Sequence, residues 1–413
     1  MSTTIAEHAA AVAALLSSVA TRERTLSLAP GEVARHPTRT RGRRLARDAR
    51  AAADVPRFDN SQMDGFAVRA EDLEGASVDA PVELPSAAPI AAGEPGGVLA
   101  PGTAVPIMTG APIPDGADAV VPVERTRAGA FGVARVAFEA PVSPGTFVRP
   151  RGIDVATGDI LAAAGTPVRP AHLGAFAAAG IPEIVVRARP RVLIVLTGLE
   201  LSNQPGPGRI PDAIGGMLSR AVAEAGGRAR TAVCPSDDPG QLWTLLETGG
   251  GWADLIVTVG GVSRGAYEVV KLALADRGVS FTHLALQPGG PQGLGTIPLT
   301  AGSRPVLAFP GNPVSALISF ELFLRPWLRE RAGLSPAARR GERMPLAVAL
   351  DSPAHQHQIR RGSLRDDGRV EPVGGPGSHL IAHYAAADCL IHVPLGVTRL
   401  EPGDEVEVWR LDD

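Results

Sequence analysis

The sequence has few aromatic residues, only two cysteines and a single lysine. Aromatic side chains make up 4% of its 413 residues, so Ala, Val, Leu and Ile must fill the hydrophobic cores. Cys234 and Cys389 cannot form a disulfide framework, which predicts a reducing compartment. Lys271 is the only lysine among 40 basic residues; the others are arginines, a bias that a GC-rich genome produces.

A strong net charge is also absent. The formal charge of -3 at pH 7 gives no indication of a nucleic acid or an anionic membrane as the main partner. Glu7 and His8 stand where an export signal needs basic residues, and the apolar stretch at 9–20 is shorter than the ~20 residues that cross a bilayer. We therefore expect a soluble cytoplasmic protein that binds neither nucleic acid nor membrane.

The length and composition predict several folded domains. Hydrophobic residues make up 45% of the chain and charged residues 20%, which excludes wholesale disorder. At roughly 150 residues per domain, the 413 residues form two to four domains. The 48 glycines and 38 prolines are typical of a turn-rich protein with many strands.

The first half of the chain predicts short elements. An Ala-rich helix is expected at 3–20, and broken Val- and Ala-rich runs predict a β-rich module at 55–145. Further short strands and a helix at 170–179 are expected within 146–185. Residues 35–50 hold seven arginines, which we interpret as the solvated face of a helix or strand, with an anion-binding patch as the alternative.

The second half predicts an open α/β sheet with right-handed crossovers. Continuous apolar runs, typical of strands buried on both faces, occur at 192–196, 255–259 and 306–309. Helical stretches lie between and after these runs, at 213–226, 238–247, 267–277 and 313–328. Short alternating strands after residue 336 predict a small β domain.

A glycine-bearing loop follows each apolar run: TGLEL at 197–201, GGVSRG at 260–265 and PGNPVS at 310–315. Ligands of open α/β sheets bind beyond the carboxyl ends of the strands. Glycine lets the backbone approach a ligand, and helix starts, such as the one predicted by Asn312 and Pro313, offer N–H groups to an anion. One such loop alone is an ordinary connection, but three on one edge favour a phosphate-bearing ligand.

Four acidic residues follow predicted strands at the same edge: Glu200, Asp237, Asp238 and Glu268. Each alone fits a helix cap or a surface charge. Beside an anion they indicate a cation, and Mg²⁺ is held by a few carboxylates plus substrate oxygens. Neither a Walker A motif nor G-x-G-x-x-G occurs, which argues against an ordinary nucleoside triphosphatase and against a dinucleotide-binding enzyme.

Five motifs occur along the chain in this order: DVPRFDNSQMDGFA at 54–67, IMTGAP at 107–112, RPRG at 149–152, GGVS at 260–263 and PGNPVSA at 310–316. With these motifs the chain resembles the MoeA family of molybdopterin molybdenumtransferases, which includes the gephyrin E-domain. The first and last are specific, and GSH at 377–379 also resembles the family. The resemblance extends over essentially the whole chain.

The resemblance implies an elongated homodimer of multidomain subunits, with α/β and β architecture. A central open α/β sheet similar to MogA would be flanked by β-rich modules and a small C-terminal β-barrel. The implied domains are 21–50 with 145–187, 51–144, 1–20 with 188–332, and 338–413.

The implied reaction transfers molybdenum from molybdate to adenylylated molybdopterin, depends on Mg²⁺ and releases AMP. Its cleft would lie between the α/β domain of one subunit and the Asp-Asn-Ser module of the other. A MogA-like molybdopterin adenylyltransferase is the expected partner, because it would supply the adenylylated substrate.

The same resemblance implies the site residues. Catalytic roles fall to Asp64, Thr109, Glu200, Asp237 and Glu268, of which the last three would hold the metal. Substrate-binding roles fall to Asn60, Ser61, Arg149, Arg151, Gly260, Gly261, Ser263, Lys271, Gln287, Gly289, Pro310, Gly311, Asn312, Pro313, Ser315 and Ser378.

Several positions depart from the family pattern. Leu199 replaces an acid, and Glu268 aligns with an aspartate metal ligand. Gln287 and Gly290 stand where the family has lysines. Genomic bias alone would give arginine, which keeps the charge, so positive charge has been lost there unless Arg264 or another arginine compensates. These departures support a second hypothesis, a degenerate paralogue that binds pterin or a partner without catalysis.

Charge accounting gives a first prediction. Replacing Gln287 with Lys should tighten binding of the anionic pterin, because it restores a cation at the phosphate end. The gain should shrink as salt rises, since salt screens exposed charges. Equilibrium binding at two salt concentrations tests this, and an unchanged affinity at low salt would mean that residue 287 does not face the phosphate.

Overall fold

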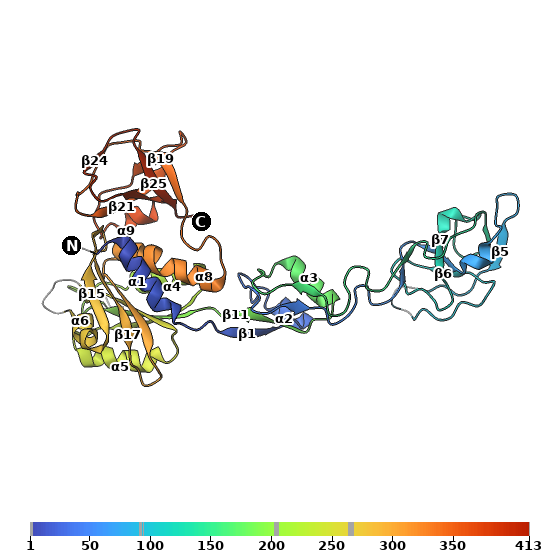
Figure 1. Ribbon diagram of the computed structural model, residues 1–413, viewed down its shortest axis with the longest axis horizontal. Helices are drawn as coiled ribbons and strands as arrows, with labels where there is room; N and C mark the ends of the chain where they lie inside the picture. Colours follow the sequence, from blue (N-terminus) through green and yellow to red (C-terminus); the bar gives the residue numbers. More distant parts are fainter. Residues whose placement is uncertain (1–2, 91–92, 94, 202–205, 263–267, 413) are drawn as a thin grey trace. The chain divides into compact units, whose positions relative to one another are not determined.

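The computed structural model describes residues 3–90, 93, 95–201, 206–262 and 268–412. The chain forms two compact units, shown in Figure 1. The first unit contains Met1–Arg24, Gly42–Arg44 and Val186–Asp413, and the second contains Thr25–Arg41 and Leu45–Val185. The division into four domains is finer than these units and stays a prediction. Within the described ranges, no helix combines the length and the apolar character that crossing a membrane requires.

The second unit is built mainly from short strands, as its Pro- and Gly-broken sequence predicts. Its sheets pair β6-β4-β7, β5-β8, β3-β9 and β10-β2, and β1 pairs with β11 at its boundary. The strands are β1 (Glu23–Ser27), β2 (Ala49–Arg50), β3 (Asn60–Ser61), β4 (Gly65–Val68), β5 (Val82–Pro85), β6 (Val105–Ile107), β7 (Ala119–Pro122), β8 (Arg135–Phe138), β9 (Val148–Arg149), β10 (Ile160–Ala162) and β11 (Glu183–Arg187). The helices are α2 (Pro30–Arg35), η1 (Ala70–Leu73), η2 (Val123–Arg125) and α3 (Pro170–Ala178).

The arginine-rich segment 35–50 is mostly irregular, so the expected helix or strand face is wrong. Only Arg35, at the end of α2, and the two residues of β2 belong to regular elements. Pro37 disfavours helical geometry at the preceding residue, and Gly42 adopts a φ of 65° within a turn. The backbone preferences of Pro37 and Gly42 therefore prevent the regular element that the repeated arginines suggested.

The first unit contains the expected α/β sheet, in the order β13-β12-β14-β18-β17-β15. Strands β13, β12, β14 and β18 are parallel, whereas β17 and β15 add an antiparallel edge that the sequence pattern did not reveal. The strands are β12 (Arg191–Thr197), β13 (Arg228–Cys234), β14 (Leu255–Val259), β15 (Val279–His283), β17 (Pro291–Ile297) and β18 (Arg304–Phe309).

Helices cover both faces of this sheet, as continuous apolar strands require. Alternate residues of β12 pack into two separate cores: Val192, Ile194 and Leu196 on one face, Leu193 and Val195 on the other. Figure 1 shows α1 and α8 on one side and α5 and α6 on the other. The helices are α1 (Ile5–Ser17), α4 (Ile214–Glu224), α5 (Pro239–Gly250), α6 (Val269–Leu274), η3 (Ala275–Arg277), α7 (Pro313–Ser319), the π-helical η4 (Phe320–Leu324) and α8 (Arg325–Ala332). The stretch predicted as one helix at 313–328 is thus α7, η4 and the start of α8.

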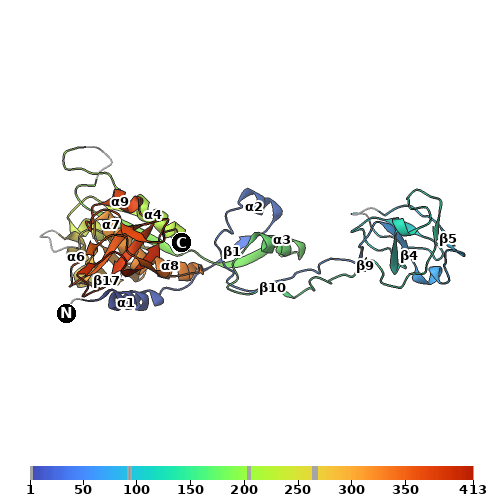
Figure 2. The same ribbon diagram turned by 90° about the horizontal axis from the view of Figure 1, so that it is seen from above.

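The C-terminal domain packs on the α/β domain within the same unit, and Figure 2 shows α7 and α9 side by side. Its main sheet runs β16-β21-β23-β25-β19, with β22 on β21. The first strand, β16, lies in the α/β region and pairs in parallel with β21. Closure into a barrel stays a prediction. The elements are β16 (Leu286–Gln287), β19 (Gly341–Pro345), β20 (Leu350–Asp351), β21 (His357–Leu364), β22 (Val370–Pro372), α9 (Ile381–Ala385), β23 (Cys389–Val393), β24 (Arg399–Leu400) and β25 (Glu405–Arg410).

A buried ion-pair cluster links the π-helical turn to the C-terminal domain. Glu321 accepts hydrogen bonds from Nε and Nη2 of Arg339 at 2.7 and 3.1 Å, and Arg325 Nε lies 3.5 Å from it. The three side chains are at most 8% exposed. Arg339 also donates to the carbonyl of Arg410, at the end of β25. The cluster therefore fixes the position of the C-terminal sheet on the helices.

Replacing Glu321 with Ala should lower the free energy of unfolding by about 3–5 kcal/mol, because it leaves two buried guanidinium groups without their carboxylate. Chemical denaturation followed by circular dichroism measures the loss. Replacing Glu224 with Ala should change the free energy of unfolding by about 0.5 kcal/mol or less, because its ion pair with Arg220 is exposed. Equal losses of stability in the two variants would contradict the stabilising role of the buried cluster.

Candidate functional site

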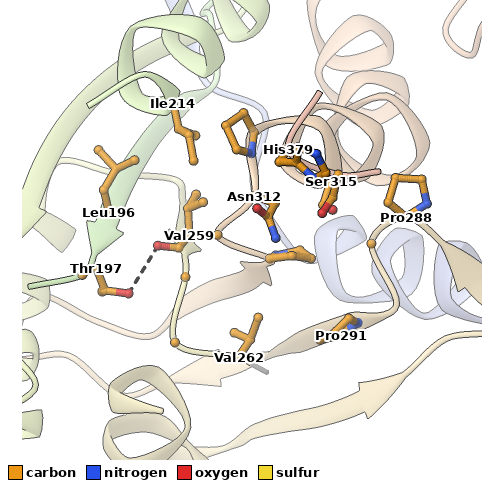
Figure 3. Close-up of a pocket in the computed structure, with 18 of the residues that line it drawn as sticks. Leu196, Thr197, Ile214, Val259, Val262, Pro288, Pro291, Asn312, Ser315 and His379 are labelled. Atoms are coloured by element: carbon orange, nitrogen blue, oxygen red, sulfur yellow. Dashed lines mark hydrogen bonds between the residues drawn. The ribbon is translucent and has the colours of Figure 1, made fainter. Parts of the chain in front are cut away.

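A cavity of about 910 Å³ opens at the carboxyl edge of the central sheet. The loops after β12, β14 and β18 line it, together with residues 287–291 and, from the C-terminal domain, 376–379 (Figure 3). The three glycine-bearing loops thus lie around one cavity, as expected from parallel strands that end on one edge.

Glycine allows these loops to touch. Gly260 has a φ of 96°, and a Cβ there would lie 2.7 Å from the carbonyl oxygen of Thr197. A Cβ on Gly311 would lie 3.2 Å from the Cα of Gly260. The Thr197 hydroxyl donates to the carbonyl of Val259 at 3.3 Å, the dashed line of Figure 3. The ends of β12, β14 and β18 are therefore held backbone against backbone.

Asn312 and Pro313 begin α7, as predicted, but the side chain of Asn312 does not cap the helix. Asn312 holds the N-cap position without a capping hydrogen bond from its side chain. It lines the cavity with Ser315, and Figure 3 shows the two side chains close to each other. The start of α7 therefore presents an amide, a hydroxyl and helix N–H groups to a ligand.

Three of the four predicted acids line the cavity: Glu200, Asp237 and Glu268. Asp238 instead caps α5, where its carboxylate accepts from the Gly240 N–H at 2.9 Å. Among the described residues, no three His, Cys, Asp or Glu side chains lie close enough together to hold a metal ion. A group of three is not required for Mg²⁺, which proteins usually hold by one or two carboxylates and by oxygens of the substrate.

At the two positions where the family has lysines, this chain has a glutamine and a glycine, and each packs against a side chain of the same unit. Gln287 lines the cavity, and its Oε1 accepts from Gln358 Nε2 at 2.6 Å. A Cβ on Gly290 would lie 2.7 Å from Nε2 of His283, so the imidazole fills the space beside this glycine. The substitution Gln287→Lys would therefore take away the acceptor of the buried Gln358 amide as well as add a charge.

The structure also reveals lining residues that the sequence did not single out. His283, Gln356 and His379 contribute to the cavity wall. His379 belongs to the GSH motif at 377–379, whereas His283, at the end of β15, and Gln356, in a C-terminal loop, carry no sequence signal. Of the predicted substrate-binding residues, the following line the cavity: Gly260, Gly261, Gln287, Gly289, Pro310, Gly311, Asn312, Pro313, Ser315 and Ser378.

Other predicted residues lie elsewhere. Lys271 belongs to α6 and is not part of the cavity wall. Ser263 lies outside the described residues, as does Arg264. The remaining predicted residues belong to the second unit: Asn60, Ser61, Asp64, Thr109, Arg149 and Arg151.

The residues of the second unit form their own network of hydrogen bonds. The backbone N–H and the hydroxyl of Thr109 donate to Oδ1 of Asp64 at 2.6 and 2.8 Å, and they hold the pKa of this carboxyl below its ordinary value. Arg149 donates to Oδ1 of Asn60 at 3.1 Å. The Ser61 hydroxyl donates to the carbonyl of Met63 at 2.6 Å, which keeps the loop before Asp64 in a turn. The pair Asp64–Thr109, 45 residues apart in the chain, is thus brought together.

The structure is that of an α/β protein with added β-rich parts and a cavity at the carboxyl edge of its central sheet. Three family models match it: "MoeA N-terminal region (domain I and II)" over residues 4–180, "Probable molybdopterin binding domain" over 193–330, and "MoeA C-terminal region (domain IV)" over 343–411. The chain belongs to the MoeA family.

Relatives extend the match to nearly the whole chain. Molybdopterin molybdenumtransferase 2 of Mycobacterium tuberculosis is 43% identical over 387 residues, covering 91% of this chain and 94% of that protein. Molybdopterin molybdenumtransferase 1 of the same organism is 35% identical over 382 residues, covering 86% and 88%. The crystal structure of a molybdopterin biosynthesis MoeA protein from Pyrococcus horikoshii covers 99% of both chains with a TM-score of 0.78 and 28% identity.

Replacing Thr109 with Val should raise the pKa of Asp64 part of the way to its ordinary value, because one of the two hydrogen bonds to the carboxylate is lost. A depressed carboxyl pKa contributes stability above the unfolded-state pKa, and this contribution disappears as the pH falls through the folded-state pKa. The stability gap between variant and wild type should therefore close on acidification. An NMR titration of the Asp64 carboxyl measures the shift, with Thr103→Val as the control; equal pKa values in both variants would contradict it.

Proposed function

We propose that this protein is a molybdenum insertase, which transfers molybdenum from molybdate to adenylylated molybdopterin and releases AMP. One observation carries the proposal: in a chain of the MoeA family, three glycine-bearing strand ends and three acids surround one cavity. Its relatives are named molybdopterin molybdenumtransferases, which supports a role in molybdenum cofactor biosynthesis. A catalytically impaired paralogue has no support from these comparisons.

The cavity suits a ligand that carries a pyrophosphate linkage. Backbone N–H groups at Gly311 and the start of α7 can donate to phosphate oxygens, as at other helix starts that bind anions. Ser315, in α7, and Ser378, in the segment before α9, add hydroxyls to the lining. These groups would orient the phosphates and keep the cleaved bond in one position.

Mg²⁺ is the proposed cation, held by Asp237, Glu200 and Glu268 in combinations of one or two carboxylates plus substrate oxygens. When bound, it would offset the charge that develops on the phosphate oxygens during cleavage. Because the three acids come from the loops after β12 and β13 and from the start of α6, they surround the cavity from several sides.

The proposal also covers the oligomeric state of the protein, the enzyme that supplies its substrate and its location in the cell. We propose a cytoplasmic homodimer that receives adenylylated molybdopterin from a MogA-like adenylyltransferase. In it, Asp64 and Thr109 of one subunit would complete the cleft of the other. Sedimentation should give about twice the 42.5 kDa of one chain, and a monomer at micromolar concentration would contradict this arrangement.

The decisive experiment measures AMP release from adenylylated molybdopterin with molybdate and Mg²⁺. Asp237→Asn should lower the rate about tenfold or more, since it removes a carboxylate at the metal. Asp238→Asn is a matched control, because asparagine also caps helices and residue 238 is no part of the cavity wall. If wild-type protein binds the pterin but releases no AMP, the insertase function is wrong.

A further inference from the structure

The cavity has an apolar part as well as a polar part. Figure 3 shows Leu196, Ile214 and Val259 on one side, and Ser315 and His379 on the other. The three apolar residues belong to one core cluster of the α/β domain. The volume of about 910 Å³ lies near the upper end of the roughly 300–1,000 Å³ of small-molecule sites. The proposed phosphate contacts use only the polar part, so the apolar part has room for another portion of a ligand.

Two exposed apolar side chains extend the apolar part toward solvent. Leu199 is 58% exposed and Ile210 is 53% exposed, and both line the cavity. The N–H of Ile210 donates to the carbonyl of Glu200 at 2.8 Å, and Leu201 forms a β-bridge with Ile210. The loop after β12 is thus joined to the segment before α4. One exposed apolar side chain is ordinary, but two on joined segments of a cavity wall indicate a ligand contact.

The start of α4 is poorly suited to an anion. Asp212 is the only acid of the segment 210–214, and it is not part of the cavity wall. Its Oδ1 accepts from the N–H groups of Ile214 and Gly215 at 2.9 and 2.7 Å. Because a carboxylate already occupies this helix start, a phosphate would gain little there. The residues of the segment that line the cavity are apolar: Ile210, Pro211, Ala213 and Ile214.

Glu200 is the charged residue that the loop 197–201 contributes to this part of the wall. A Cβ on Gly198 would lie 2.5 Å from Oε2 of Glu200, so the carboxylate lies against the backbone of its own loop. The described wall contains no Phe, Tyr or Trp. A ligand in the apolar part would therefore contact the faces of aliphatic side chains.

A flat heteroaromatic ring suits such a surface. Its faces carry no hydrogen-bonding groups, and they gain dispersion contacts with aliphatic side chains. A sugar or a phosphate would lose its hydrogen bonds to water there without replacing them. The substrate of the proposed reaction contains two such rings, a pterin and a purine. Both have the chemistry that the apolar part requires.

We propose that the apolar part of the cavity binds one heteroaromatic ring of the substrate, and that Leu199 and Ile210 contact the face of this ring. Leu199 stands where the MoeA family has an acid, so this contact is a property of this chain. The inference rests on the proposed function for the identity of the substrate. The binding of small ring compounds tests it independently of catalysis.

The experiment uses three monophosphates as probes: AMP, neopterin phosphate and ribose phosphate, which lacks an aromatic ring. Their affinities are measured by calorimetry without Mg²⁺. The wild type should bind at least one of the two ring compounds about tenfold or more tightly than ribose phosphate. Leu199→Asn removes apolar surface without adding charge. It should weaken binding of that ring compound about fivefold or more, and change the affinity for ribose phosphate by less than about twofold.

The two ring probes distinguish the two possible sources of the ring. A loss confined to AMP assigns the site to the purine, and a loss confined to neopterin phosphate assigns it to the pterin. Either result supports the proposal. Equal losses for all three probes would indicate a general distortion of the cavity and would overturn it. Unchanged affinity for both ring compounds would overturn it too, as would a wild type that prefers neither of them to ribose phosphate.

Three further variants separate ring contact from other effects. Leu199→Met keeps the apolar surface and should stay within about twofold of wild type for every probe. Leu395→Asn makes the same change at a leucine that is 44% exposed and lies outside the cavity wall, so the three affinities should not change. Ile210→Thr repeats the test at the second position if thermal unfolding shows that Leu199→Asn is unstable.

The readouts distinguish this inference from the proposed function. In the AMP-release assay, Leu199→Asn should raise KM for adenylylated molybdopterin more than it lowers kcat, since binding of the ground state is affected first. A wild type that prefers a ring compound but releases no AMP would defeat the proposed function alone. AMP release by the wild type, with unchanged affinities for both ring compounds in Leu199→Asn, would defeat this inference alone.

Discussion

The close approach of three strand ends determines the site. A Cβ on Gly311 would lie too close to the Cα of Gly260, and a Cβ on Gly260 too close to the carbonyl oxygen of Thr197. Any side chain at Gly260 would meet this backbone and would have to adopt a positive φ. The loops can therefore approach one another this closely only because these positions lack a Cβ.

The electrostatics of the cavity depend on the few charged side chains in its described wall. Acids at Glu200, Asp237 and Glu268 suit a bridging cation, but they oppose an anion that arrives without one. Two buried arginines of β21, Arg360 and Arg361, donate to the carbonyls of Gly374 and Gly375, next to the wall segment 376–379. The C-terminal domain, which is joined to the α/β region through β16 and the Glu321 cluster, contributes residues 376–379 to the cavity wall.

Sequence patterns predicted the central fold well and the local exceptions poorly. The apolar runs gave β12, β14 and β18 within two residues, because a strand buried on both faces admits almost no polar residue. The antiparallel strands β15 and β17 were not predicted, because their five and seven residues have mixed polarity and show little of the alternation that indicates a strand. The π-helical turn around Glu321 also has no signature of its own, and the arginines at 35–50 suggested regularity that Pro37 and Gly42 prevent.

The sequence alone determined the order of elements, the loops that carry glycine and the acids that follow them, because these depend on neighbours along the chain. It also carried the motifs of the MoeA family. Only the tertiary structure decided which of two adjacent acids faces the cavity: Asp237 lines it, whereas Asp238 caps a helix. It alone joined Gln287 to Gln358, 71 residues away, and brought two buried arginines against the carbonyls of Gly374 and Gly375. Such contacts depend on how separate segments pack, and packing distance is not encoded in any local pattern of residues.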